Sequence, residues 1–183
     1  HGFKLVFKDS YIGNLAENAE ITVTYNATLN EKAAVGDTGN GNTNSAALTY
    51  GNNKSVTNTT TTRTYEFDLL KVDGADHKLL NGAEFKLYDA ETGGNEIKLV
   101  KNEDDTYRVA TATETPVAYI ETVAGKTVKI SGLDKKVYYL EETVPPAGYN
   151  GLTQRVKVDL STGSKKVPTG FLSNGTYDEL NAS

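Results

Sequence analysis

The sequence contains no cysteine, no methionine and no tryptophan, and only two histidines among its 183 residues. Without cysteine, the chain cannot form disulfides, thiol nucleophiles or cysteine-based metal sites. A serine–histidine–aspartate triad would have to use His1 or His77, and the residues around His77 do not resemble a nucleophile turn. Glycine-rich phosphate-binding motifs are also missing. These absences disfavour a metabolic enzyme, and we expect neither a cofactor nor a metal.

The sequence also has few basic residues and no long apolar run, and both features limit what the protein can bind. Basic residues are in the minority, with 19 Lys and Arg against 24 Asp and Glu, and the formal net charge of −5 disfavours binding to nucleic acid or to an anionic membrane surface. No apolar run approaches the ~20 residues that cross a bilayer, so we expect no membrane insertion. The 11 tyrosines and 5 phenylalanines still supply enough apolar bulk for a folded core.

The sequence that is present is of β type, rich in Thr, Val, Tyr, Asn and Gly, with almost no helical periodicity. Residues 3–7 and 21–29 alternate apolar and polar positions, and 21–29 is expected to form a half-buried strand. At most one helical turn is expected in residues 9–15. A turn cluster at 37–42 leads into a strand that carries on one face Ala46, Leu48, Tyr50 and Asn52.

Residues 55–64 are polar and rich in threonine, which favours an extended linker between domains. A second series of short strands follows, divided by turn sequences, and covers residues 65–72, 83–88, 97–101, 107–110, 127–130, 136–142 and 155–160. This spacing predicts an all-β, Ig-like sandwich. We therefore interpret residues 1–60 as the C-terminal part of one Ig-like domain and residues 61–183 as a second Ig-like domain.

The first of these parts is short, because a complete sandwich typically needs ~100 residues. Either its remaining strands lie upstream of His1, or it is not an independent domain. We favour the interpretation that the sequence comes from a longer protein, which leaves open whether the second domain is complete at its C-terminus.

Two charged residues have the parity of buried positions. Lys71 shares the parity of the apolar residues in strand 65–72, and Glu142 shares that of the apolar residues in strand 136–142, whereas Glu141 has the opposite parity. The alternatives are a strand-end lysine that reaches solvent and a carboxylate at a strand edge. Because buried charges need partners, the two residues make each other's burial more plausible. A lysine held neutral in a core is a nucleophile.

The strand that carries Glu142 also resembles a known motif. The sequence YYLEETVPPAGY, residues 138–149, resembles the E-box of Gram-positive pilins, YxLxETxAPxGY, and departs from it at Pro145, where alanine is usual. Residues 70–73 (LKVD) and 80–85 (LNGAEF) resemble the opening strands of the CnaB-type Ig-like domain of the same proteins. The resemblance covers residues 64–160.

The earlier part of the chain is similar to the same family. Residues 23–30 and 41–53 look like the closing strands of a preceding, CnaA-type domain in a sortase-assembled pilus backbone subunit. The resemblance implies a structural protein outside the cell, in the cell wall or pilus, whose partners are other pilin subunits joined by sortase. The alternative is a surface adhesin, built from the same domains, that binds host matrix or cell-surface ligands.

The resemblance also implies an autocatalytic, intramolecular isopeptide bond. Lys71 would attack the side-chain amide of an asparagine on the last strand, Glu142 would act as the catalytic acid, and ammonia would leave. Asn174 is the first candidate acceptor, Asn181 is the second, and an acceptor beyond the last residue is the third. Asn52 looks like the acceptor of the preceding domain, unless it is a turn residue. Such a reaction is a single self-modification, so the protein is not expected to be an enzyme.

Overall fold

The structure is a computed structural model that describes residues 2–29, 32–36, 39–51, 54–123, 125–161, 172–173 and 176–177. Within these ranges the chain is almost entirely β, with one short helix, α1 (Asp9–Ile12). The strands are β1 (Asn42–Tyr50), β2 (Lys54–Thr62), β3 (Tyr65–Leu69), β4 (Glu84–Tyr88), β5 (Leu99–Lys101), β6 (Tyr107–Val109), β7 (Ile120–Glu121), β8 (Val128–Leu133), β9 (Val137–Val144), β10 (Val156–Asp159), β11 (Leu172–Ser173) and β12 (Thr176–Tyr177). The predicted all-β class is confirmed.

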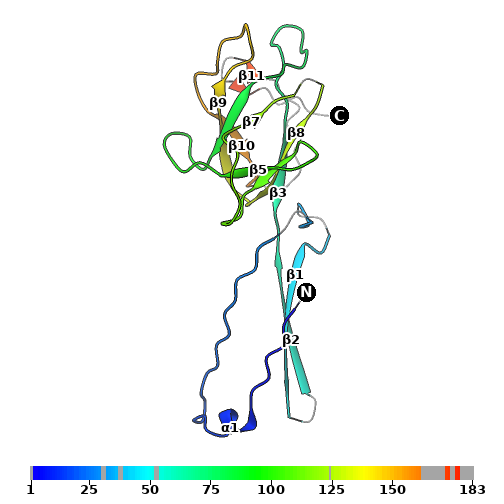
Figure 1. The fold of residues 1–183 in the computed structure, drawn as a ribbon, viewed down its shortest axis with the longest axis vertical. Helices are drawn as coiled ribbons and strands as arrows, with labels where there is room; N and C mark the ends of the chain where they lie inside the picture. Colours follow the sequence, from blue (N-terminus) through cyan, green and yellow to red (C-terminus); the bar gives the residue numbers. More distant parts are fainter. Residues whose placement is uncertain are drawn as a thin grey trace.

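Two four-stranded sheets form the upper body of the molecule in Figure 1. Their strand orders are β10-β9-β4-β7 and β3-β8-β6-β5, and within them only β6 and β8 pair in parallel among the described strands. Burial alternates along β3, β4 and β9, as expected for strands with one face on a core. Each stretch predicted after residue 64 overlaps a strand, whereas the two-residue β7 was not predicted, because it is too short to show a period.

The two sheets share one apolar core, which is the evidence for a sandwich. Its buried members are Phe67, Leu69, Ala83, Phe85, Leu87, Leu99, Tyr107, Ile120, Val128, Ile130, Leu133, Tyr138 and Leu140. Because both sheets contribute to this cluster, the inward faces of β3 and β9 meet in the same interior. A polar side chain on either face therefore lies inside the sandwich.

The hairpin β1–β2 projects from the sandwich (Figure 1). The two strands pair in an antiparallel register that runs from Asn42 opposite Thr62 to Tyr50 opposite Lys54. The linker prediction for residues 55–64 was therefore wrong in one respect: the chain is extended there, but most of it is a paired strand. Threonine is well suited to a strand. The predicted domain division after residue 60 falls within β2 and stays a prediction.

The expected strand at residues 21–29 and the alternation at 3–7 do not lead to paired strands. Across residues 2–29, α1 is the one regular element that the structure describes, and it confirms the helical turn expected in 9–15. The large apolar side chains of this stretch are exposed, namely Phe3, Leu5, Val6, Phe7, Tyr11, Ile12, Ile21, Val23, Tyr25 and Leu29. A strand needs a neighbour for its backbone hydrogen bonds, and no described strand pairs with these residues.

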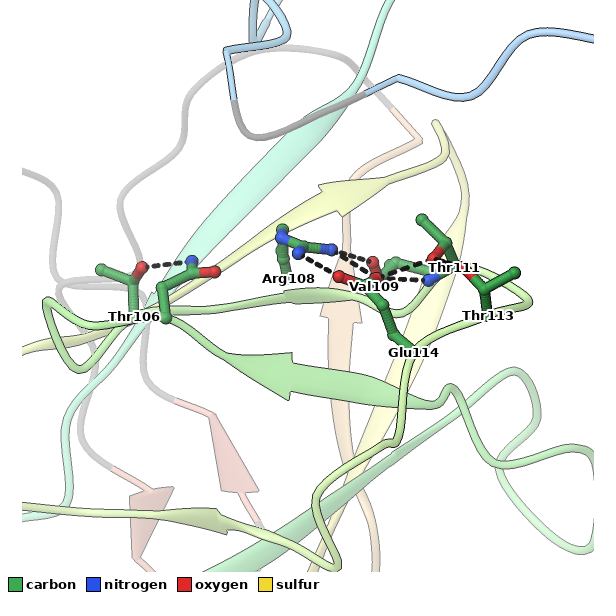
Figure 2. A network of polar contacts seen from close by, with 7 residues as sticks. Thr106, Arg108, Val109, Thr111, Thr113 and Glu114 are labelled. Carbon is green, nitrogen blue, oxygen red and sulfur yellow. Dashed lines mark hydrogen bonds and ion pairs between the residues drawn. The ribbon is translucent and has the colours of Figure 1, made fainter.

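A polar network anchors the loop between β6 and β7 (Figure 2). Arg108, on β6, donates hydrogen bonds to both carboxylate oxygens of Glu114, and the Nη1–Oε2 distance is 2.8 Å. The main-chain N–H of Thr111 and its hydroxyl also donate to Oε2, at 2.8 Å and 2.9 Å. All these donors favour the charged carboxylate, and with Arg108 as the largest cause they lower the pKa of Glu114 to about 2.

This network predicts an acid-dependent loss of stability. The contribution of Glu114 is complete above the ordinary glutamate pKa of 4.5 and is lost as the pH falls towards the folded-state pKa of about 2. We expect the free energy of unfolding, measured by urea denaturation, to fall more steeply over this range in the wild-type chain than in Glu114→Gln. Glu91→Gln, at an exposed position, is the control. Parallel curves for wild type and Glu114→Gln would contradict the assignment.

Candidate functional site

Lys71 lies two residues beyond the end of β3, with its side chain turned inward. The alternation of β3 continues past its last residue, because Leu70 is exposed and the side chain of Lys71 is only 15% exposed. The backbone is fixed on the C-terminal side of this lysine: the N–H of Leu80 donates to the carbonyl of Lys71 at 2.8 Å, and Val72 forms a β-bridge with Leu79. The backbone that carries the lysine side chain is therefore held in a defined place.

Glu142 lies on β9 and faces the same interior. Its side chain is 0% exposed, and its cross-strand neighbour is Phe85 of β4. The Nζ atom of Lys71 lies 2.9 Å from Oε1 of Glu142. The structure thus brings together the two residues whose inward parity was noted in the sequence. A carboxylate so completely removed from water requires a charged or hydrogen-bonding partner.

The two oxygens of Glu142 have different surroundings. Oε2 accepts a hydrogen bond from the main-chain N–H of Leu152 at 2.8 Å. Oε1 is buried, and among the described residues it accepts no hydrogen bond of good geometry, so its contact with Lys71 is an ion pair only. Sequence reasoning missed Leu152, since a main-chain donor can belong to any residue type except proline and leaves no pattern.

A second contact connects the motif to the loop after Lys71. The hydroxyl of Tyr149 donates to Oδ2 of Asp73 at 2.6 Å, while Oδ1 accepts the N–H groups of Ala75 and Asp76 at 2.6 Å and 3.2 Å. The Tyr149 hydroxyl is the largest cause that lowers the pKa of Asp73, and the same hydrogen bond raises the pKa of Tyr149. The last residue of the motif is therefore tied to the turn that follows the lysine.

Glu141 has a different role from its neighbour in the sequence. It lies on the outer face of β9, where its Oε2 accepts a hydrogen bond from Nε of Arg155 at 2.8 Å. The guanidinium of Arg155 also donates to the carbonyls of Ala90 and Gly93, at 2.9 Å and 2.6 Å, and lies 3.4 Å from the ring centroid of Tyr88. Glu141 thus supports a surface network, whereas the next residue lies inside the sandwich.

The three predicted acceptors, Asn52, Asn174 and Asn181, lie outside the described residues. Among the described strands, β3 pairs with β8 alone, so no described strand covers its other edge. No cluster of three or more metal-binding side chains occurs in the described ranges. No helix in that part of the chain is long and apolar enough to cross a membrane.

Comparison with known protein families agrees with this geometry. Residues 65–170, more than half of the chain, match the family described as SpaA, prealbumin-like fold domain. The chain belongs to the SpaA family. The matched range begins at the first residue of β3 and includes both members of the buried pair. The resemblance to pilin domains noted in the sequence is confirmed at this level.

Several solved pilin structures are similar to this SpaA-family chain. The pilus 2b backbone protein of group B streptococcus is 28% identical over 72% of this chain and 46% of its own, with a TM-score of 0.50. The minor pilin GBS52 of Streptococcus agalactiae is 34% identical over 52% of this chain and 38% of its own (TM-score 0.42). The C-terminal domain of the shaft pilin SpaA from Lactobacillus rhamnosus GG is 24% identical over 55% of this chain and 93% of its own (TM-score 0.41).

The present chain spans less than half the length of the group B streptococcus protein. No curated protein matches the sequence.

Tyr138, the first residue of the motif, anchors the turn that precedes β9. Its side chain is buried in the core, and its hydroxyl oxygen accepts the N–H of Asp134 at 2.8 Å. Burial disfavours the phenolate and raises the pKa of Tyr138 to about 12. The motif therefore has a neutral, buried residue at its start and a hydroxyl bonded to a carboxylate at its end.

An alkaline loss of stability follows from Tyr138. Because the folded state favours the neutral phenol, its contribution is complete below the ordinary tyrosine pKa of 10.0 and is lost as the pH rises towards about 12. We expect the free energy of unfolding to fall more steeply between these pH values in the wild-type chain than in Tyr138→Phe, as measured by urea denaturation. Loss of the hydroxyl changes the free energy of unfolding of the variant by the same amount at every pH. The comparison therefore uses the slope of the free energy of unfolding against pH. Equal slopes would show that Tyr138 titrates normally.

Proposed function

We propose that this chain is part of a structural subunit of a cell-surface pilus and that it forms an intramolecular isopeptide bond between Lys71 and an asparagine side chain. The observation that carries this proposal is the 2.9 Å contact between a lysine that is nearly buried and a glutamate that is fully buried. A buried ion pair is a weak source of stability, because desolvation offsets its attraction. Such a pair is well suited to chemistry that needs a neutral amine.

The reaction can be written with the atoms of this site. Transfer of a proton from Nζ of Lys71 to Oε1 of Glu142 gives a neutral amine and a neutral acid. The amine attacks the carbonyl carbon of the asparagine side chain while the acid donates a hydrogen bond to the carbonyl oxygen. A new C–N bond forms, the bond to the amide nitrogen breaks, and the amine's proton passes through Glu142 to the leaving group. Ammonia departs, and Glu142 returns to the acid form.

Fixed placement supplies much of the rate, since a held amine and a held carbonyl react as one molecule. The edge of β3 that no described strand covers is where a strand that carries the acceptor would pair, close to Lys71. Asn174 is the first candidate and Asn181 the second, while Asn52 is the proposed acceptor of the preceding domain, to which residues 1–60 are assigned.

The likeness to the pilus backbone protein of group B streptococcus supports the cellular role. The proposed partners are other pilin subunits, joined by sortase-made links, and the proposed location is the cell wall or pilus, outside the cell. Adhesion to a host ligand, the alternative raised by the sequence, stays a prediction.

The intact mass of the unfolded chain tests the bond directly. We expect the wild-type chain, weighed in denaturant, to be lighter than its sequence mass by one ammonia for each bond. Glu142→Ala should have the full mass expected from its sequence, with no loss of ammonia, because the acid that moves the protons has been removed. Glu141→Ala is the matched control: it breaks the contact with Arg155 but leaves the buried pair, so its bond should form. Loss of ammonia in Glu142→Ala would rule out the proposed role.

Stability gives a second test. Closing a loop of about 100 residues with a crosslink contributes about 4.7 kcal/mol in the chain-entropy model, and measured values are often smaller. We expect Lys71→Met, which keeps the apolar stem, to lower the free energy of unfolding by an amount of this order. The double variant Lys71→Met, Glu142→Gln removes the unpaired carboxylate and isolates the effect of the crosslink. If wild type and the double variant unfold at the same urea concentration, no bond stabilises this chain.

A further inference from the structure

One short loop contacts Glu142 directly and also contacts the turn that follows Lys71. We propose that residues 149–152 form a positioning loop that aligns Lys71 and Glu142 for reaction, an inference that rests on the proposed crosslinking function. The loop begins with the last residue of the motif and uses two groups: the main-chain N–H of Leu152, which binds Glu142, and the hydroxyl of Tyr149, which binds Asp73. Tyr149 and Leu152 are positioning residues, since neither touches the reacting atoms.

The Leu152 amide selects which oxygen of Glu142 reacts. A main-chain N–H can only donate, so it binds Oε2 through a lone pair and favours the proton on the other oxygen. That other oxygen is Oε1, which lies 2.9 Å from Nζ of Lys71 and accepts no hydrogen bond of good geometry from the described residues. Proton transfer from the lysine therefore has one available oxygen.

The loop backbone lies directly against this carboxylate. A Cβ atom placed on Gly151 would be 4.0 Å from Oε2 of Glu142 and 3.8 Å from Cγ of Pro145. These are ordinary van der Waals distances for an added atom, so Gly151 lies beside both the carboxylate and Pro145. Because its donor is a main-chain N–H and its acceptor belongs to a buried side chain, the hydrogen bond from Leu152 has less freedom than a contact between two surface side chains.

Tyr149 positions the lysine from the other side. Asp73 is two residues after Lys71, and its second oxygen binds the N–H groups of Ala75 and Asp76, which shape the turn. The same turn returns the chain to Leu80, whose N–H donates to the carbonyl of Lys71. The Tyr149 hydroxyl therefore fixes the turn that holds the lysine backbone, while Leu152, three residues later, fixes the glutamate.

The rate of bond formation tests this proposal. Each chain is made by cell-free translation, aliquots are quenched in denaturant, and the loss of ammonia is followed by intact mass. Tyr149→Phe removes one hydroxyl, and Tyr119→Phe is its matched control, because the two tyrosines are equally exposed, at 39% and 40%. Leu152→Pro removes the N–H, and Leu152→Ala, which keeps it, is the control for the lost side chain.

We expect Tyr149→Phe and Leu152→Pro to form the bond about tenfold more slowly than wild type, or slower still, since each loses a hydrogen bond to a carboxylate. The two controls should react at the wild-type rate. Circular dichroism at the reaction temperature establishes that each variant is folded. A merely structural contact would lower the melting temperature and leave the rate in the folded chain unchanged.

The outcomes separate this inference from the proposed function. If wild type loses ammonia and Tyr149→Phe reacts equally fast, the positioning role is wrong while the crosslinking function stands. If Leu152→Pro folds and reacts as fast as Leu152→Ala, the positioning role is also wrong. If Leu152→Pro does not fold, Tyr149→Phe alone decides. If wild type never loses ammonia, the crosslinking function fails, and the positioning role fails with it.

Discussion

The contact between Lys71 and Glu142 is the constraint around which the rest of the sandwich is arranged. Two opposite charges lie 2.9 Å apart in an interior built mostly from apolar side chains. Removing them from water costs several kcal/mol for each ion, and their attraction repays this only when geometry and hydrogen bonds are good. Here one oxygen of the carboxylate has no well-directed hydrogen bond among the described residues. The pair is therefore poorly optimised as an ion pair and well placed for proton transfer.

The elements around the pair each limit its freedom in a different way. The register between β9 and β4 fixes the position of Glu142 along the sheet, because it places Glu142 opposite Phe85. The turn after β3 fixes the backbone of Lys71 through the N–H of Leu80. On the outer face of β9, Glu141 and Arg155 tie the strand to the loop after β4. The outer network is accessible to water and is expected to affect stability alone, whereas the inner contacts would set the geometry of the proposed reaction.

Parity made the inward positions of Lys71 and Glu142 predictable, because a strand places alternate residues on one face whatever their chemistry. The same rule failed for residues 21–29, since alternation describes a face but does not provide the neighbouring strand that a paired backbone requires. It also gave no sign of β2, where threonines occupy both faces and no period distinguishes a strand from a linker. The Leu152 amide could not be predicted at all, because it depends on where a loop backbone lies and not on a side chain.

The short connection between β2 and β3 affects how the sandwich would respond to a pulling force. Arg63 and Thr64 alone separate the two strands, so tension along the hairpin would pass directly into β3 and then to Lys71. In the described sheet β3 is an edge strand, which is held by hydrogen bonds to β8 only. Backbone hydrogen bonds break one after another under load, whereas an amide bond from Lys71 to a later strand would carry that load covalently. The edge position of β3 in the described sheet, which leaves it weakly held as a strand, is therefore also the position where the proposed crosslink would protect the sandwich most.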